Sequence, residues 1–262
     1  MKNARTSLAF AALTVAAFAA MPAQAAQKNI GVTSFDTISI QGDFIVTVTE
    51  TTGSSVVANG DSLALEALDV RVDSRRTLVI REMRVDNKPR GATNVKRKPI
   101  QITIRASGLS GISMMGNGRL TVTGIREPEA FLTLRGNGAL VADKLNSRNV
   151  TAALDGAGTM TVIGKTQALD VRMAGAGSMD MRGFAVSDLI VRANGNGVGN
   201  FIASRRAEVN ASGLGTVTVT GRAACKVNNE GLGDVYCGAA SKAPAADDAA
   251  DTNAGVIIGE ES

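Results

Sequence analysis

Apolar and polar residues alternate with a period of two through much of the chain, and the triplet Gly-x-Gly interrupts this alternation at regular intervals. The triplet occurs seven times, and successive first glycines are 20, 20, 19, 20, 18 and 18 residues apart. A fixed period in this range indicates a solenoid, in which one small unit stacks on its neighbours. The triplets span Gly116–Gly118, Gly136–Gly138, Gly156–Gly158, Gly175–Gly177, Gly195–Gly197, Gly213–Gly215 and Gly231–Gly233.

The positions two and four residues before and after each triplet share an apolar character. Among these 28 positions only Gly199 and Asn229 depart from it. Because alternate residues of a strand face the same side, each unit is predicted to be a strand, a Gly-x-Gly corner and a second strand. We name these 28 positions the inward positions, because they are expected to line a shared core.

Glycine has a mechanical reason to recur at a sharp corner between strands. Such a corner needs a positive φ or a close backbone approach, both of which cost glycine little. A second corner is expected six residues after several triplets, at Gly124, Gly164, Gly183 and Gly221. The sequence therefore predicts an all-β parallel solenoid with about 18–20 residues per rung over residues 101–238.

Residues 26–100 carry the same alternation without the regular triplets, so we expect an N-terminal β-strand part of the solenoid that could cover one of its ends. Strands are predicted around Phe35–Ile40, Phe44–Val48 and Leu78–Ile80. Ser62–Leu68 fits either one helical turn or another short strand.

A basic segment, residues 81–99, breaks this rhythm and is predicted to be an exposed loop or hairpin. It contains two prolines and a glycine. A solvated run of charge explains it, and so does an electropositive patch for acidic polysaccharide or lipid headgroups. The candidate anion- or glycan-binding residues are Arg81, Arg84, Lys88, Arg90, Lys96, Arg97 and Lys98.

Both ends of the chain fall outside the repeat. Residues 1–25 have a basic start, an apolar run and the small-residue pattern Ala23-Gln24-Ala25, which together predict a cleaved signal peptide. No later stretch has the roughly 20 apolar residues that span a bilayer. Residues 239–262 are rich in Ala, Asp and Glu, and are predicted to be a disordered acidic tail. We therefore expect an exported protein of the periplasm or cell surface.

The two cysteines of the chain, Cys225 and Cys237, flank the last triplet on inward positions of the pattern. In an exported protein with two cysteines, pairing is the default, and a disulfide is predicted. Two small buried thiols and a redox role are the alternatives, although the spacing is not that of a CxxC motif.

The composition removes several classes of chemistry. The chain has no His and no Trp, and its formal net charge of +4 falls to +2 once Lys2 and Arg5 are cleaved, so neither a metal site nor a nucleic-acid partner is expected. No cofactor motif is present either. Glycoside hydrolysis needs paired carboxylates, and only Glu230 and Asp234 lie near each other in the repeat. Arg172 and Arg192 occupy one outward column in adjacent rungs, with Arg135 two rungs earlier, which suggests a shallow anion site or ordinary surface charge.

The opening segment Phe35–Val48, the strand Leu78–Ile80 and the serial Gly-x-Gly corners resemble the GIN domain, the putative auto-transporter adhesin head domain of bacterial exported proteins. The resemblance covers about residues 34–238. It implies a right-handed parallel β-helix and a role outside the cytoplasm, and it brings no catalytic residues. The chain differs from an auto-transporter in having no translocating barrel.

Three hypotheses follow for the function. The first is a non-enzymatic envelope or surface protein of the binding or adhesion type, whose partner is a glycan, a cell-wall component or an envelope protein. The second is a polysaccharide-active enzyme on the same scaffold. The third is a structural protein that assembles end to end, against which the predicted disulfide and tail argue.

Overall fold

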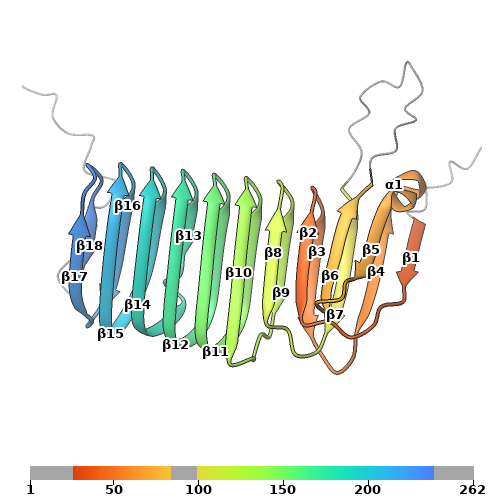
Figure 1. Ribbon diagram of the computed structural model, residues 1–262, viewed down its shortest axis with the longest axis horizontal. Helices are drawn as coiled ribbons and strands as arrows, with labels where there is room; N and C mark the ends of the chain where they lie inside the picture. Colours follow the sequence, from red (N-terminus) through yellow and green to blue (C-terminus); the bar gives the residue numbers. More distant parts are fainter. Residues whose placement is uncertain (1–25, 84–98, 239–262) are drawn as a thin grey trace, which may run out of the picture.

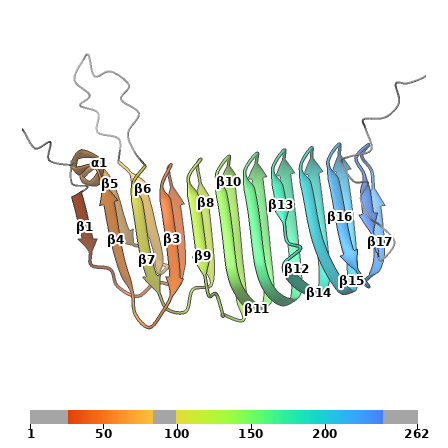
Figure 2. The same ribbon diagram turned by 180° about the vertical axis from the view of Figure 1, so that it is seen from behind.

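The computed structural model describes residues 26–83 and 99–238. Over this part of the chain the protein is an elongated β-solenoid, with its strands stacked side by side along one long axis (Figure 1). Two sheets lie against each other across a narrow core, and the view from behind shows the same row of strands (Figure 2). The predicted all-β solenoid is thus confirmed.

Seven rungs carry the Gly-x-Gly triplets and stack in the order of the sequence. Adjacent rungs pair in parallel, so that Gly136, Gly156, Gly175, Gly195 and Gly213 lie in register. Their strands are β8 (Gly111–Met115), β9 (Arg119–Thr123), β10 (Glu129–Gly136), β11 (Ala139–Gly156), β12 (Thr159–Gly175), β13 (Ser178–Asp180), β14 (Phe184–Gly195), β15 (Val198–Gly213), β16 (Thr216–Gly221), β17 (Ala224–Asn229) and β18 (Val235–Cys237).

Each rung has one tight turn and one wide turn. The Gly-x-Gly triplets form the tight turns along the upper edge in Figure 1, which we name the corner edge. Long strands such as β11 and β12 run around the wide turns of the opposite edge, the bend edge. We call the sheet of segments that end at the corners the ascending sheet, and the sheet of segments that follow the corners the descending sheet.

The inward positions form the core, as the alternation predicts. In the four rungs with corners from Gly116 to Gly175, every inward position is buried. In the last rung none is buried, and Val227 is 44% exposed. The core therefore runs the length of the solenoid and opens at its C-terminal end.

The corner glycines are required by both backbone conformation and close stacking. Gly136 has a φ of +110°, which is unfavourable for any residue with a Cβ atom. A Cβ atom added to Gly158 would lie 2.6 Å from the carbonyl oxygen of Gly138 in the preceding rung. The first glycine thus turns the chain, and the second lets successive corners stack.

The bend edge absorbs the variation in repeat length. The register between β11 and β12 shifts between Ala142 and Leu145, and the register between β14 and β15 shifts between Val186 and Asp188. Each shift places an extra residue in one of the two paired strands. Corners can therefore stay in register although the repeat varies.

Two further rungs precede the first triplet, and their order along the axis differs from their order in the sequence. Strand β2 (Thr37–Gln41) pairs in parallel with both β6 (Thr77–Glu82) and β8. Strand β3 (Ile45–Glu50) pairs in the same way with β7 (Gln101–Ala106) and β9. The β2–β3 rung is therefore held between a rung from the chain after it and the first Gly-x-Gly rung.

Antiparallel strands and a helix cover the N-terminal end. β4 (Ser55–Gly60) pairs with β7, β1 (Ala26–Ile30) pairs with β4, and β5 (Leu68–Val72) pairs with β6, all antiparallel. Helix α1 (Ser62–Glu66) resolves the sequence ambiguity in favour of a helical turn, and the Asp61 carboxylate accepts a hydrogen bond from the Leu63 N–H. The core at this end is closed, since Val56 and Leu65 are buried.

The connection between β6 and β7 is longer than the equivalent corner of the neighbouring rung. Gln41 is in register with Arg81, and Ile45 is in register with Gln101. Residues 82–100 therefore connect two strands where residues 42–44 suffice in the neighbouring rung. Residues 84–98, like the predicted signal peptide (1–25) and acidic tail (239–262), lie outside the described residues.

Candidate functional site: a polar depression on the ascending sheet

Of the seven basic-loop candidates, the structure describes only Arg81. Its Nε lies 2.8 Å from Asp69 Oδ2, so this guanidinium is paired within the N-terminal end of the solenoid. Arg71 approaches the same Asp69 oxygen at 3.0 Å. Arg84, Lys88, Arg90, Lys96, Arg97 and Lys98 lie outside the described residues, so their binding role stays a prediction.

The two cysteines form the predicted disulfide. Their Sγ atoms are 2.07 Å apart and their Cα atoms 6.1 Å apart. The bond joins β17 to β18 across the last rung, which removes the free-thiol interpretation. Cys225 is nevertheless exposed and Cys237 half-buried, because no further rung covers them within the described residues.

A shallow depression of about 500 Å³ lies on the outer face of the ascending sheet, over the last four rungs. Its outward side chains are two guanidiniums, three amides, a hydroxyl and a carboxylate. They belong to Arg172, Arg192, Asn194, Asn210, Ser212, Asn228 and Glu230. Ala174 lies next to Arg172 on the outer face, and its small side chain contributes to the depth of the depression.

The arginine pair predicted from the sequence lies in this depression. Arg172 and Arg192 are in register on β12 and β14, which places their Cα atoms about 4.8 Å apart. Arg192 Nη1 lies 2.6 Å from Asp170 Oδ1, and this hydrogen-bonded carboxylate raises the pKa of Arg192 above its ordinary value. Arg172 has no ion pair or side-chain hydrogen bond within residues 26–83 and 99–238, so its charge is available to a ligand. Arg135 does not line the depression.

The amides continue the depression towards the C-terminal end. Asn210 is in register with Arg192 and with Asn228, so one outward column reads Arg, Arg, Asn, Asn across four strands. The Asn228 amide donates to Glu230 Oε1 at 3.1 Å. The sequence analysis identified the two arginines and missed the amides, although the same column count places them beside each other.

The acidic side chains of the described residues form no metal-binding group, since no group of three His, Cys, Asp or Glu side chains there could hold a metal ion. The one carboxyl with a raised pKa is Glu50 on β3, where burial is the main cause, Arg126 opposes it and Glu127 adds to it. The period-two alternation could have identified this residue, because Glu50 falls on the same inward-facing side of the strand as Val46 and Val48.

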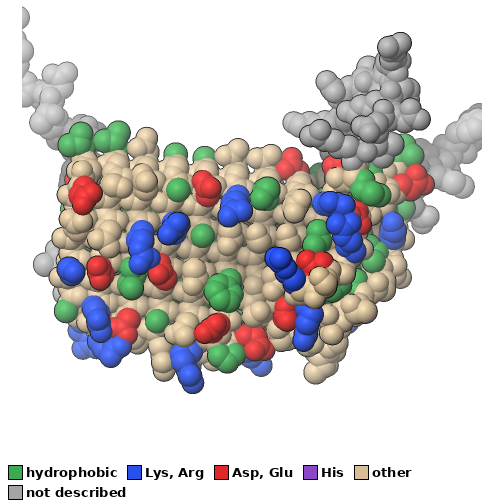
Figure 3. Space-filling view, in the orientation of Figure 1, with side chains coloured by type: hydrophobic (Ala, Val, Ile, Leu, Met, Phe, Trp, Pro, Cys, Tyr) green, Lys and Arg blue, Asp and Glu red, His purple; other side chains and the backbone are tan. Residues whose placement is uncertain are grey.

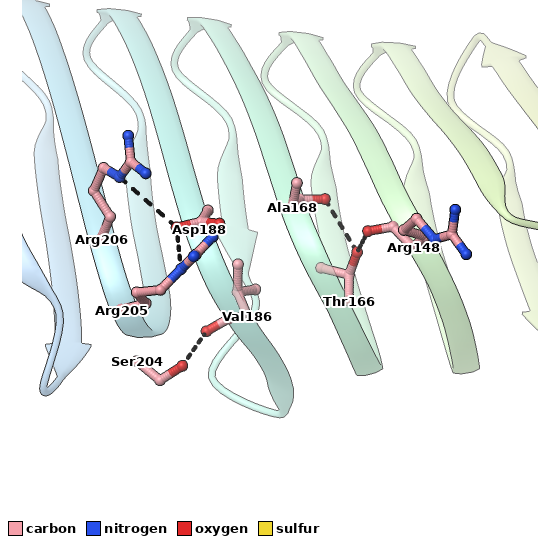
Figure 4. A network of polar contacts seen from close by, with 8 residues as sticks. All are labelled: Arg148, Thr166, Ala168, Val186, Asp188, Ser204, Arg205 and Arg206. Carbon is pink, nitrogen blue, oxygen red and sulfur yellow. Dashed lines mark hydrogen bonds and ion pairs between the residues drawn. The ribbon is translucent and has the colours of Figure 1, made fainter.

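A second polar cluster lies at the bend edge (Figure 4). Asp188 accepts hydrogen bonds from the Arg205 guanidinium, and Arg206 Nε lies 3.8 Å from the same carboxylate. The Arg205 hydrogen bond lowers the pKa of Asp188. The Thr166 hydroxyl lies 3.0 Å from the carbonyl oxygens of both Arg148 and Ala168, so it stabilises the bend rather than a ligand.

Charge of both signs is spread over the solenoid surface. Figure 3 shows blue and red side chains scattered along the rungs rather than gathered into one field of a single sign. Recognition on this face therefore depends on local groups rather than on a broad electrostatic attraction. In the described residues no helix is long and apolar enough to cross a membrane.

The repeat, the corner glycines and the fold agree with one family. Residues 34–223 match the model of the putative auto-transporter adhesin, head GIN domain. The chain belongs to this family. No curated protein matches it at a significant level of sequence similarity.

Several solved structures share this fold. A putative adhesin from Bacteroides fragilis has a TM-score of 0.75 at 18% identity, and the alignment covers 82% of this chain and 97% of that one. A putative lipid binding protein from Parabacteroides distasonis has a TM-score of 0.65 at 15% identity, with 82% and 96% covered. A putative adhesin from Parabacteroides merdae has a TM-score of 0.62 at 15% identity, again with 82% and 96% covered. At these identities the likeness concerns the fold alone.

Proposed function

We propose that this GIN-domain protein is an exported, non-enzymatic binding protein that holds a carboxylate-bearing saccharide of the cell envelope in the depression on its ascending sheet. The observation that carries the proposal is the unpaired Arg172 guanidinium inside a row of amide and hydroxyl groups. The family description and two of the three structural relatives, named as putative adhesins, support a binding role at a surface.

Arg172 supplies the charge that such a ligand needs. Its neighbour Arg192 is tied to Asp170, whereas Arg172 keeps all its donors. A guanidinium presents a planar pair of N–H donors that match a carboxylate, and such charge-assisted hydrogen bonds are about twice as strong as neutral ones. The acidic group of the ligand is therefore assigned to the Arg172 end of the depression.

The amides and the hydroxyl supply groups that suit sugar hydroxyls. Asn194, Asn210 and Asn228 each offer two donors and an acceptor, and Ser212 offers one donor and two acceptor sites. Successive strands place such groups about 4.8 Å apart along the solenoid axis. An extended chain of sugars laid along this axis can meet several of them, whereas a compact anion uses only Arg172.

Binding to a panel of purified polysaccharides tests the proposal. The wild-type chain is expected to bind uronic-acid-containing polysaccharides and to bind neutral ones weakly. Arg172→Ala should weaken binding about tenfold to a hundredfold, since hydrogen bonds to charged groups contribute about 1.5–3 kcal/mol. Arg135→Ala is the matched control, because it removes an arginine from the same face outside the depression.

Two results would contradict the proposal. If replacement of Arg90, Lys96, Arg97 and Lys98 by Ser abolishes binding while Arg172→Ala leaves it intact, the site lies in the basic loop. Release of reducing ends or unsaturated sugars from any polysaccharide would show an enzyme instead of a binding protein.

A further inference from the structure

The C-terminal end of the solenoid has two strands with an open edge. β17 pairs only with β15, and β18 pairs only with β16. Within the described residues the other edge of each strand has no strand partner. Exposed apolar side chains accompany this edge, since Leu232 is 89% exposed, Leu214 61% and Val227 44%. An open edge of this kind invites pairing with another strand.

We propose that a second copy of this chain covers this end, so that two solenoids meet at their C-terminal ends about a two-fold axis. Self-complementary charge on the edge strand carries the proposal. Lys226, Asn228 and Glu230 follow one another on the outer face, with Asn228 at the centre. An antiparallel pair of β17 strands centred on Asn228 places Lys226 of each copy opposite Glu230 of the other.

The hydrogen-bonding direction of β17 fits this register. The Glu230 N–H donates to the Ala211 carbonyl on β15. Because alternate residues of a strand point their backbone groups to opposite edges, Val227 and Asn229 direct theirs to the open edge. In the centred register these two residues form the hydrogen-bonded pairs between copies. Lys226 and Glu230 then form non-hydrogen-bonded pairs, where side chains lie closest.

Strand β18 of the descending sheet also directs backbone hydrogen-bonding groups to its open edge. The Val217 N–H donates to the Asp234 carbonyl, so the backbone groups of Val235 and Cys237 point to the open edge. A pairing of β18 with its own copy centred on Tyr236 would join Val235 to Cys237 by backbone hydrogen bonds. Asn228 and Tyr236 each lie four residues from Leu232 at the corner, so one axis can serve both strands. The only tyrosine of the chain then faces its own copy, and aromatic cross-strand pairs are favourable.

The proposed contact joins two copies and does not continue into a filament. The N-terminal end is closed by β1, β4, β5 and α1, and Lys28 lies in the middle of its edge strand β1. Charged residues on an edge strand oppose further pairing. An interface that uses the same patch on both copies is satisfied in a closed pair, and it leads to no filament. The disulfide points inward between β17 and β18, so it leaves the open edge free.

Sedimentation of the exported full-length chain over a dilution series tests the proposal. We expect a dimer that dissociates on dilution. Glu230→Lys should raise the dimer dissociation constant at least about tenfold, because both symmetry-related pairs become repulsive. Lys226 Nζ also lies 3.8 Å from Glu208 Oε1 in its own chain. The triple variant Glu208→Gln, Lys226→Glu and Glu230→Lys should therefore restore affinity, since it exchanges the two charges and removes the carboxylate beside position 226. Asp155→Lys, at the equivalent column of an inner rung, is the control and should leave the dissociation constant unchanged.

Each other outcome overturns the proposal. A monomer at every concentration rules out the dimer. A dimer that tolerates Glu230→Lys uses another surface. A full-length monomer that becomes a dimer when the chain is shortened to end at residue 238 shows that residues 239–262 cover the end instead.

Discussion

The two ends of the solenoid differ in how far their cores are covered. At the N-terminal end, antiparallel strands and helix α1 bury the last inward side chains, and Val56 is 1% exposed. At the C-terminal end the repeat stops, and Val227 is 44% exposed on a strand of the same two-sheet architecture. A disulfide rather than a cap holds that last rung together. An end rung is therefore buried where antiparallel strands and a helix cover it, and exposed where no described residue does.

The core also becomes thinner towards the open end. The inward position two residues before each corner is Leu154 and Met173 in the middle of the solenoid, and then Ala193, Ala211 and Asn229. A small cavity of about 20 Å³ lies beneath these last corners, enough for about one water molecule. Fewer buried atoms mean less stabilisation per rung, so the C-terminal rungs are expected to open before the N-terminal ones.

The largest expected difference concerns a corner glycine within the stack and the one at its end. Gly136→Ala should lower the free energy of unfolding by about 3 kcal/mol, because φ is +110° and the added Cβ would lie 2.6 Å from the Gly116 oxygen. Gly231→Ala would also place a Cβ atom close to backbone, 2.2 Å from the Gly213 oxygen, but it should cost only about 1 kcal/mol, since Gly231 has no positive φ and no described rung lies beyond it to stop it moving outward. Urea denaturation measures both.

Gly31→Ala is the control for these two substitutions. A Cβ atom at Gly31 would meet nothing within 4 Å, so its effect should be negligible. Equal losses for Gly136→Ala and Gly231→Ala would show that the last rung is held as firmly as an inner one.

A smaller difference is expected for the same substitution at the two ends. Val56→Ala should cost about 2 kcal/mol, because two buried methyl groups are lost and a cavity remains. Val227→Ala should cost less than about 0.5 kcal/mol in the dilute monomer, as is usual for exposed positions. Thermal denaturation of both variants measures the two losses, and similar values would mean that Val227 is covered in the folded monomer.

The smallest effect is a pH dependence at the N-terminal half. Burial raises the pKa of Glu50 above its ordinary value of 4.5, so the folded chain holds a proton that the unfolded chain has already lost. The contribution of this group to stability therefore falls as the pH rises from about 4.5 through the folded-state pKa. Glu50→Gln should remove this fall and leave stability at neutral pH unchanged or higher.

Unfolding at a series of pH values compares Glu50→Gln with Glu127→Gln, which neutralises the carboxyl that acts on Glu50. The wild-type slope should flatten more in Glu50→Gln than in Glu127→Gln. Parallel profiles for wild type and Glu50→Gln would contradict the assignment.

Much of the repeat region could be predicted from the sequence because its signals are local. Inward positions follow from a period of two, corners follow from glycine pairs, and the disulfide follows from two cysteines on inward positions in one rung. These signals need no knowledge of which rung lies next to which. They also predict the Arg172 and Arg192 column, because neighbouring rungs there are consecutive in the sequence.

The order of the N-terminal rungs could not be predicted in this way. The corner at Gly42 has Phe44 where the repeat has its second glycine, so it did not count as a member of the series. Its strands pair with segments up to 74 residues away, and period-two alternation carries no information about such partners. The depression was missed for a related reason, since its shape depends on small neighbours such as Ala174 as much as on its polar groups.

The interleaved β2–β3 rung sets an order for assembly. Its two neighbours come from residues 77–106 and 111–123, so each edge of this rung stays uncovered until the later segment that pairs with it is present, and the rung is covered on both edges only once both are. Contacts over such sequence distances form slowly, whereas each later rung needs only the chain about 20 residues before it. Folding should therefore wait for one slow nucleus at the N-terminal end and then proceed rung by rung, with the disulfide formed last.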